Sequence, residues 1–291
     1  MPVLALVAVT AIWGVTFVQV KDAVELYPLF AFLALRFTIA TAALAIPGAR
    51  RLRGLGRRGL AEGALLGALL GGGYVLQTEG LARTTVSSTG FITGMYVVLT
   101  PLIALVLFRT VIPVAAWLGV LLAAFGLALL SGVHADSAVG DLLVLAGAAV
   151  YSLQIVLMER YAPLYDPMGL TLVELLTAAA GITVVAAARG EFAQPPRGWT
   201  VWGALLVTGL FASALAYLVQ TWAQQRTSAT RTALVFTLEP VWTALFGITL
   251  AGDRLGATGW AGCAAIMGGI ALAEPAAARV LARLVPRRGA T

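Results

Sequence analysis

An eleven-residue pattern that occurs twice in this chain constrains the fold more than any other feature of the sequence. The pattern Y-x-x-Q-T-x-x-x-x-R-T begins at Tyr74 and again, half a chain later, at Tyr217. The same offset relates Gly119 to Gly262 and Trp117 to Trp260. Because the repeat unit is about half the chain and is almost entirely apolar, it indicates two duplicated halves of a membrane protein.

The composition indicates an all-α integral membrane protein. Of the 291 residues, 60% are hydrophobic and 11% are charged, and the mean hydropathy is +0.94. A soluble domain is about a quarter charged, and a transmembrane barrel would alternate apolar and polar residues over segments of about ten residues, which this chain does not do. The net charge of +6 comes from clustered arginines beside apolar stretches, so it does not indicate a nucleic-acid partner.

The apolar stretches are long enough for helices to cross about 30 Å of hydrocarbon. We predict ten transmembrane helices, with short connections and no soluble domain. Their approximate ranges are 3–20, 28–47, 60–80, 87–108, 113–132, 141–161, 168–188, 201–224, 230–251 and 257–274.

The basic residues predict the orientation of these helices. With both termini in the cytoplasm, thirteen basic residues lie on the cytoplasmic side and five lie outside, as the positive-inside rule favours. Each half contains five spans, so the second half enters the membrane from the opposite side and the repeats are inverted. We therefore predict a first five-helix repeat at 1–132, a second at 133–275, and a basic cytoplasmic tail at 276–291.

Three segments resemble a known family: A-I-W-G-V-T-F at 11–17, L-T-P-L-I-A-L-V-L at 99–107, and L-E-P-V-W-T-A-L-F-G-I-T-L-A-G-D-R-L at 238–255. They are similar to the EamA-type branch of the drug/metabolite transporter superfamily, and within it to bacterial amino-acid and metabolite exporters. The resemblance implies ten helices, a central cavity between the halves, alternating access, and a place in the bacterial inner membrane. Asp253 stands where that family usually has glutamate.

The repeated motif predicts a solute-binding cavity. Tyr74, Gln77 and Thr78 share one helical face, and Tyr217 and Gln220 repeat it in the other half. Polar groups in lipid need partners or water, so these faces either line a cavity or join helices by hydrogen bonds. We favour the cavity. The full set of predicted solute-binding residues is Trp13, Tyr74, Gln77, Thr78, Tyr96, Tyr151, Gln154, Tyr217 and Gln220.

Prolines and charges within the spans are further candidates. Pro101 and Pro240 each remove a backbone donor, which either permits gating or makes a static kink. Glu239, beside Pro240, either carries a coupling proton or braces the break in the helix. For Arg36 and Glu174, at near-equivalent places in the two halves, we favour structural pairing with other spans over solute contact.

The function that fits best is a secondary transporter that exports small metabolites, above all amino acids, aromatic ones included. Efflux of drugs or other metabolites is an alternative, as is a membrane enzyme or a non-transporting scaffold. The expected partners are a small-molecule solute and the lipid bilayer, with no cofactor, no metal and no nucleic acid, and we expect a monomer. The sequence leaves the substrate, the direction of transport, and the choice between uniport and proton-coupled antiport open.

Overall fold

The computed structural model describes residues 1–84, 86–131, 137–246, 248–249 and 255–273, and all regular structure in these residues is helical. For residues 17, 18, 21, 22 and 86–88, the backbone alone is described. The predicted basic tail at 276–291 and the predicted junction of the halves at 132–133 lie outside the described residues.

The described residues of the first predicted half form six helices. They are α1 (Pro2–Leu26), α2 (Leu29–Leu52), α3 (Gly56–Leu81), α4 (Val86–Gly94), α5 (Tyr96–Phe108) and α6 (Val114–Ser131).

In the second predicted half, the described residues form seven α-helices and three other helical elements, and residues 248–249 are also π-helical. They are α7 (Ala138–Tyr161), η1 (Ala162–Leu164), α8 (Pro167–Ala188), η2 (Glu191–Ala193), α9 (Gly198–Val207), the π-helix η3 (Thr208–Leu215), α10 (Ala216–Gln224), α11 (Ala229–Phe236), α12 (Leu238–Phe246) and α13 (Ala257–Ala273).

Six helical segments within the described residues are long and apolar enough to cross a membrane, and three shorter apolar segments accompany them. The shorter ones are Pro2–Thr16, Val114–Leu130 and Ala257–Ala273. The predicted all-helical membrane class is therefore confirmed. The count of ten spans stays a prediction, because the ninth predicted span at 230–251 runs into residues outside the description.

Polar side chains define where several helices begin. Asp166 accepts hydrogen bonds from the amides of Met168 and Gly169 at 3.1 and 3.2 Å, directly before Pro167 in the first turn of α8. Glu191, although distant in sequence, accepts from the first amides of α2 at Phe30 and Ala31. These carboxylates satisfy amide groups that no helical carbonyl can reach, and they favourably face the positive ends of the helix dipoles.

Three predicted spans are interrupted in the structure. The fourth breaks at Met95 between α4 and α5, and the eighth becomes π-helical in η3. The ninth breaks at Thr237, whose amide bonds to Leu234 O three residues back, so the last turn of α11 tightens before Pro240. Pro101 lies within α5, and the helix continues through it.

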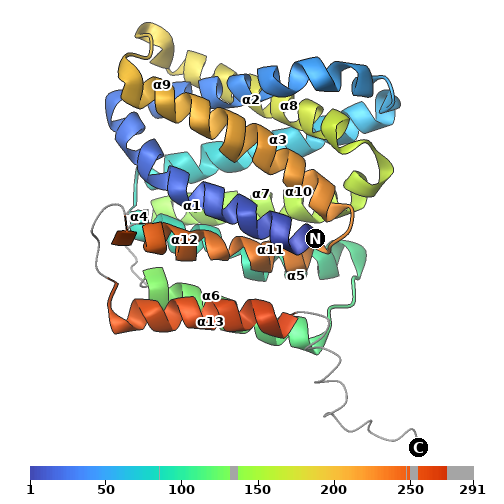
Figure 1. Cartoon of the computed structure of the whole chain (residues 1–291), viewed down its shortest axis with the longest axis vertical. Helices are drawn as coiled ribbons and strands as arrows, with labels where there is room; N and C mark the ends of the chain where they lie inside the picture. Colours follow the sequence, from blue (N-terminus) through green and yellow to red (C-terminus); the bar gives the residue numbers. More distant parts are fainter. Residues whose placement is uncertain (85, 132–136, 247, 250–254, 274–291) are drawn as a thin grey trace, which may run out of the picture.

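The helices form a layered bundle in which α6 and α13 pair at one end and α2, α8 and α9 lie toward the other (Figure 1). Glycines allow the close approach of α6 and α13. A β-carbon added at Gly126 would lie 2.6 Å from Gly262 O, and one added at Gly119 would lie 2.5 Å from Gly269 O. Between these ends, Trp13 of α1 packs against both of the large buried apolar clusters.

Candidate functional site

Seven aromatic side chains from both predicted halves form a continuous chain of ring contacts. Neighbouring ring centroids in this chain are 5.0 to 6.5 Å apart, which suits tilted and edge-to-face contacts. In spatial order the residues are Tyr96, Phe236, Trp13, Tyr217, Phe37, Tyr74 and Tyr151. Five of them were predicted from the sequence, and the structure brings these five together. Phe37 and Phe236 were not predicted.

The first residues of the two repeated motifs meet in this aromatic chain. The hydroxyl oxygens of Tyr74 and Tyr217 are 3.1 Å apart, within hydrogen-bonding distance. Tyr217 is buried, whereas Tyr74 is half-buried. The repeated positions therefore contact each other directly, α3 against α10.

Gln77 links three helices beside the tyrosines. Its amide nitrogen donates to Thr93 Oγ1 on α4 at 2.8 Å, and its amide oxygen accepts from the Tyr151 hydroxyl on α7 at 3.2 Å. All three side chains are half-buried. This arrangement places half-buried polar groups next to aromatic faces, a combination that suits a site for a small organic molecule.

A second polar layer is enclosed. Gln154 Nε2 donates to Glu174 Oε1 at 2.6 Å, and Gln220 Nε2 lies 3.4 Å from Gln154 Oε1 and 3.0 Å from Gln224 Oε1. Gln224 Nε2 donates to Ile155 O at 2.8 Å, and the four side chains are at most 2% exposed. We call Gln154, Glu174, Gln220 and Gln224 the amide layer. It lies next to the aromatic chain, since Gln154 and Gln220 are one helical turn from Tyr151 and Tyr217.

Arg36 was not among the predicted binding residues, yet it contacts the same region. Its Nε donates to Ser213 Oγ at 2.7 Å and its Nη2 donates to Ala212 O at 3.3 Å, while Trp13 Nε1 donates to that same carbonyl at 2.8 Å. The π-helical turn of η3 makes this sharing feasible, because the amide at its end, Ala216, bonds to Phe211 O and Ser213 O instead. Such π-helical turns are frequent at functional sites.

The remaining predicted residues surround this region. Thr78 and Tyr96 are buried, and Tyr96 O accepts weakly from Ser152 Oγ at 3.5 Å. Glu239 is half-buried in the first turn of α12, two residues after the break at Thr237. Pro240 is half-buried beside it, and Pro101 is buried in α5.

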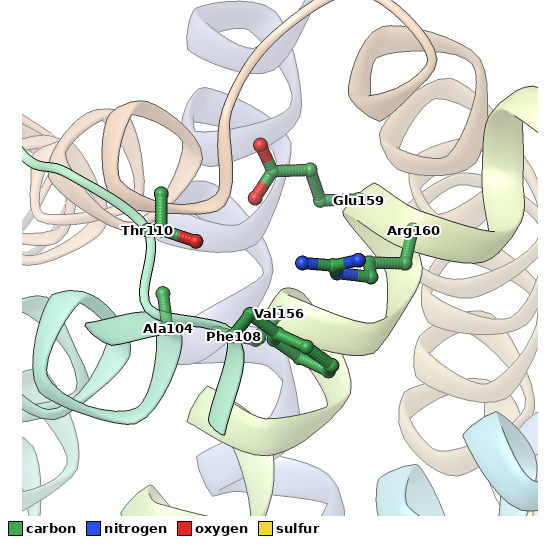
Figure 2. A pocket seen from close by; sticks show the side chains of 6 residues that line it. All are labelled: Ala104, Phe108, Thr110, Val156, Glu159 and Arg160. Carbon is green, nitrogen blue, oxygen red and sulfur yellow. The ribbon is translucent and has the colours of Figure 1, made fainter. Parts of the chain in front are cut away.

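A cavity of about 260 Å³ lies at the ends of α5 and α7, away from the aromatic chain. Figure 2 shows the Arg160 side chain beside the Phe108 ring, with its guanidinium carbon 3.8 Å from the ring centroid. Glu159 Oε2 accepts from the first amide of α11, at Ala229, at 3.0 Å. Because both charges already serve the fold, this cavity is a weaker candidate for solute binding. Within the described part of the chain, no three His, Cys, Asp or Glu side chains gather where they could hold a metal ion.

An ion-pair network joins other helix ends. Glu79 at the end of α3 pairs with Arg83 at 2.6 Å and with Arg189, just after α8, at 2.5 Å. Arg189 also pairs with Glu191, which binds the first amides of α2. The network therefore ties α2, α3 and α8 together on the side of Gln77.

The family model of the EamA-like transporters matches residues 1–132 and 138–273. This chain belongs to the EamA-like transporter family. An uncharacterized transporter of Archaeoglobus fulgidus is 32% identical over 255 residues, which are 87% of this chain and 79% of the relative. A solved crystal structure shares the fold with a TM-score of 0.82 at 21% identity, covering 96% of this chain and 98% of the other. The protein is thus a multi-pass membrane transporter, which favours transport over the enzyme and scaffold alternatives.

Proposed function

We propose that the protein is a secondary transporter that exports small metabolites, with amino acids, aromatic ones included, as its solutes. The observation that carries this proposal is the Tyr74–Tyr217 hydroxyl contact within a seven-ring aromatic chain. Apolar walls with a few polar anchors suit a small organic solute. Half-buried Gln77 supplies a polar anchor beside those rings.

We propose further that residues 1–132 and 133–275 are inverted halves of five spans each. Two contacts support this. Gly119 meets Gly269 and Gly126 meets Gly262, and the repeat offset relates Gly119 to Gly262 and Gly126 to Gly269. Exchanging the halves therefore converts one contact into the other. That is the behaviour of a two-fold relation, in which equivalent contacts occur in pairs.

The proposed mechanism is alternating access in a bacterial inner membrane, with both termini cytoplasmic, by a monomer. In that orientation the amide layer lies on the cytoplasmic side of the tyrosine pair, and half-buried Gln77 lies on the outer side. We infer that the amide layer is the closed cytoplasmic barrier in this conformation. Opening toward the cytoplasm would then separate α7 and α10 at Gln154 and Gln220.

Two transport mechanisms fit this site, facilitated uniport and proton-coupled antiport. Glu239 is the candidate coupling carboxylate, since it follows the helix break at Thr237 and directly precedes Pro240. Its other role is to brace the break before Pro240. The first mechanism needs no titrating group, whereas the second requires one.

Flux into liposomes that contain the purified protein tests the proposal. The panel holds radiolabelled aromatic and aliphatic amino acids, a cationic drug and a nucleotide sugar. We expect saturable amino-acid flux above that of protein-free liposomes, abolished by Tyr217→Ala. Flux of the drug alone would instead establish multidrug efflux, and flux of none of these solutes would reject the proposal.

A further inference from the structure

Arg36 carries a buried charge with neutral partners only. Its side chain is 7% exposed, and its hydrogen-bond acceptors are the Ser213 hydroxyl and the Ala212 carbonyl. Of the carboxylates that the structure describes, none lies within 4.0 Å of the guanidinium. A buried cation is costly unless an anion or a well-formed hydrogen-bond set compensates it. Among the described residues, this group therefore lacks a close anionic partner.

The contacts of Arg36 fix the orientation of its guanidinium group but engage only two of its three nitrogens in hydrogen bonds within the part of the chain that the structure describes. Nε and Nη2 donate to η3, and the guanidinium carbon lies 5.8 Å from the ring centroids of both Phe37 and Tyr74. Nη1 has no acceptor in the described residues, and it is not among the enclosed polar atoms that lack a partner. Nη1 is thus the guanidinium nitrogen left to bind a solute, beside the rings of Phe37 and Tyr74.

We propose that Arg36 binds the carboxylate group of the transported solute. This inference rests on the proposed function and names the chemistry of its site: solutes that carry a carboxylate, beside an aromatic or apolar group. A guanidinium that is held by two bonds and two rings is preorganised for a carboxylate. In the proposed binding mode, a zwitterion would place its ammonium group toward the carboxylate of Glu239, in the first turn of α12.

The alternative role for Arg36 is purely structural, since its bonds to Ser213 and Ala212 also brace η3. The two roles differ in ligand selectivity. A brace would affect all solutes alike, whereas a carboxylate-binding residue distinguishes a solute from its analogue that lacks the carboxylate.

Binding of three matched ligands to the purified wild-type protein tests the inference without any substitution. The ligands are phenylalanine, phenethylamine, which lacks the carboxylate, and 3-phenylpropionate, which lacks the amine. We expect phenethylamine to bind at least about tenfold more weakly than phenylalanine, the scale of one charge-assisted contact. Equal binding of phenethylamine, or no binding of either carboxylate, would overturn the inference. Binding of 3-phenylpropionate without phenylalanine would reject amino acids as solutes but support the role of Arg36.

Substitution of Arg36 then tests whether this residue is responsible for the preference for carboxylate ligands. Arg36→Gln should weaken phenylalanine binding by about tenfold to a hundredfold and change phenethylamine binding by less than about twofold. Equal losses for both ligands would mean that Arg36 only braces η3. Arg36→Lys keeps the positive charge but not the planar guanidinium group, so it should retain part of the preference for phenylalanine. If Arg36→Gln does not fold, Arg36→Lys is the variant that tests the inference. The matched control is Arg160→Gln, which removes a ring-stacked arginine outside the site and should leave both affinities unchanged.

Discussion

The hydroxyl oxygens of Tyr74 and Tyr217 lie 3.1 Å apart, although each belongs to a different copy of the repeated motif. Equivalent residues of two halves related by a two-fold axis touch each other only close to that axis. The tyrosine pair therefore marks the proposed axis. Its surroundings differ, because Gln77 is half-buried on one side and Gln220 is enclosed on the other. An alternating-access cycle would interchange these two environments.

Removing one hydroxyl of the tyrosine pair should cost stability unequally. Tyr74→Phe leaves the buried Tyr217 hydroxyl without its partner, which should cost about 1–3 kcal/mol of unfolding free energy. Tyr217→Phe leaves the half-buried Tyr74 hydroxyl, which water can reach, so we expect a loss of only about 0.5–1.5 kcal/mol. The double variant should lose less than the sum of the two. Thermal unfolding in detergent measures all three, and strictly additive losses would contradict a direct bond.

The two repeated glutamines should separate transport from stability. Gln77→Ala removes a half-buried anchor, so we expect flux to fall from a few-fold to about tenfold with little change in melting temperature. Gln220→Ala leaves Gln154 and Gln224 without their amide donor inside an enclosed layer. It should therefore also destabilise the fold, by about 1–3 kcal/mol. Wild-type flux in Gln77→Ala would remove Gln77 from the proposed site.

The site residues that could be predicted from the sequence are those that recur at helical spacing and in both copies of the repeat. Tyr74, Gln77, Tyr217 and Gln220 were predicted because helical spacing and the internal repeat both mark them. Phe37 and Phe236 were missed, since an apolar ring in a membrane span has the same pattern whether it faces lipid, core or solute.

The π-helical turn in η3 also had no readable signal. Its freed Ala212 carbonyl accepts from Trp13 and Arg36, and both side chains come from other helices, so no local sequence pattern marks the turn. The break before Pro240 could be predicted from the sequence, because proline has no backbone N–H group to donate within a helix. The break at Met95 has no such mark, since Pro101 follows it by more than a turn and lies inside α5.

The glycine contacts between α6 and α13 predict equal effects of two distant substitutions. A β-carbon at Gly126 would lie 2.6 Å from Gly262 O, and one at Gly262 would lie 2.6 Å from Gly126 O. Gly126→Ala and Gly262→Ala should each force the helices apart and cost about 1–3 kcal/mol. Gly181→Ala is the control, because nothing lies within 4 Å of its added β-carbon. Thermal unfolding of the three variants measures these effects. An unaltered melting temperature in Gly126→Ala would contradict this packing.

The proposed orientation predicts opposite labelling of two exposed loops. Cys263 is the single cysteine, so Cys263→Ala provides the background. In intact cells, Arg53→Cys should be protected from a membrane-impermeant maleimide, because the arginine-rich loop between α2 and α3 is expected in the cytoplasm. Gln194→Cys, after η2, should react, and lysis should make Arg53→Cys react as well. The reverse result would invert the topology.

The role of Glu239 predicts how transport responds to pH. If its carboxyl group exchanges a proton in each cycle, Glu239→Gln is fixed in a neutral form and should abolish the pH dependence of flux while solute binding persists. If Glu239 only braces the break at Thr237, glutamine is nearly isosteric and still forms hydrogen bonds, so the pH profile should match that of the wild type and the melting temperature should change instead. The control is Arg160→Gln, which removes an arginine outside this site and should leave the pH profile unchanged. Flux measured across a series of external pH values, with and without an imposed proton gradient, separates the outcomes. A wild-type rate that is insensitive to both would establish uncoupled uniport, in which no carboxylate needs to titrate.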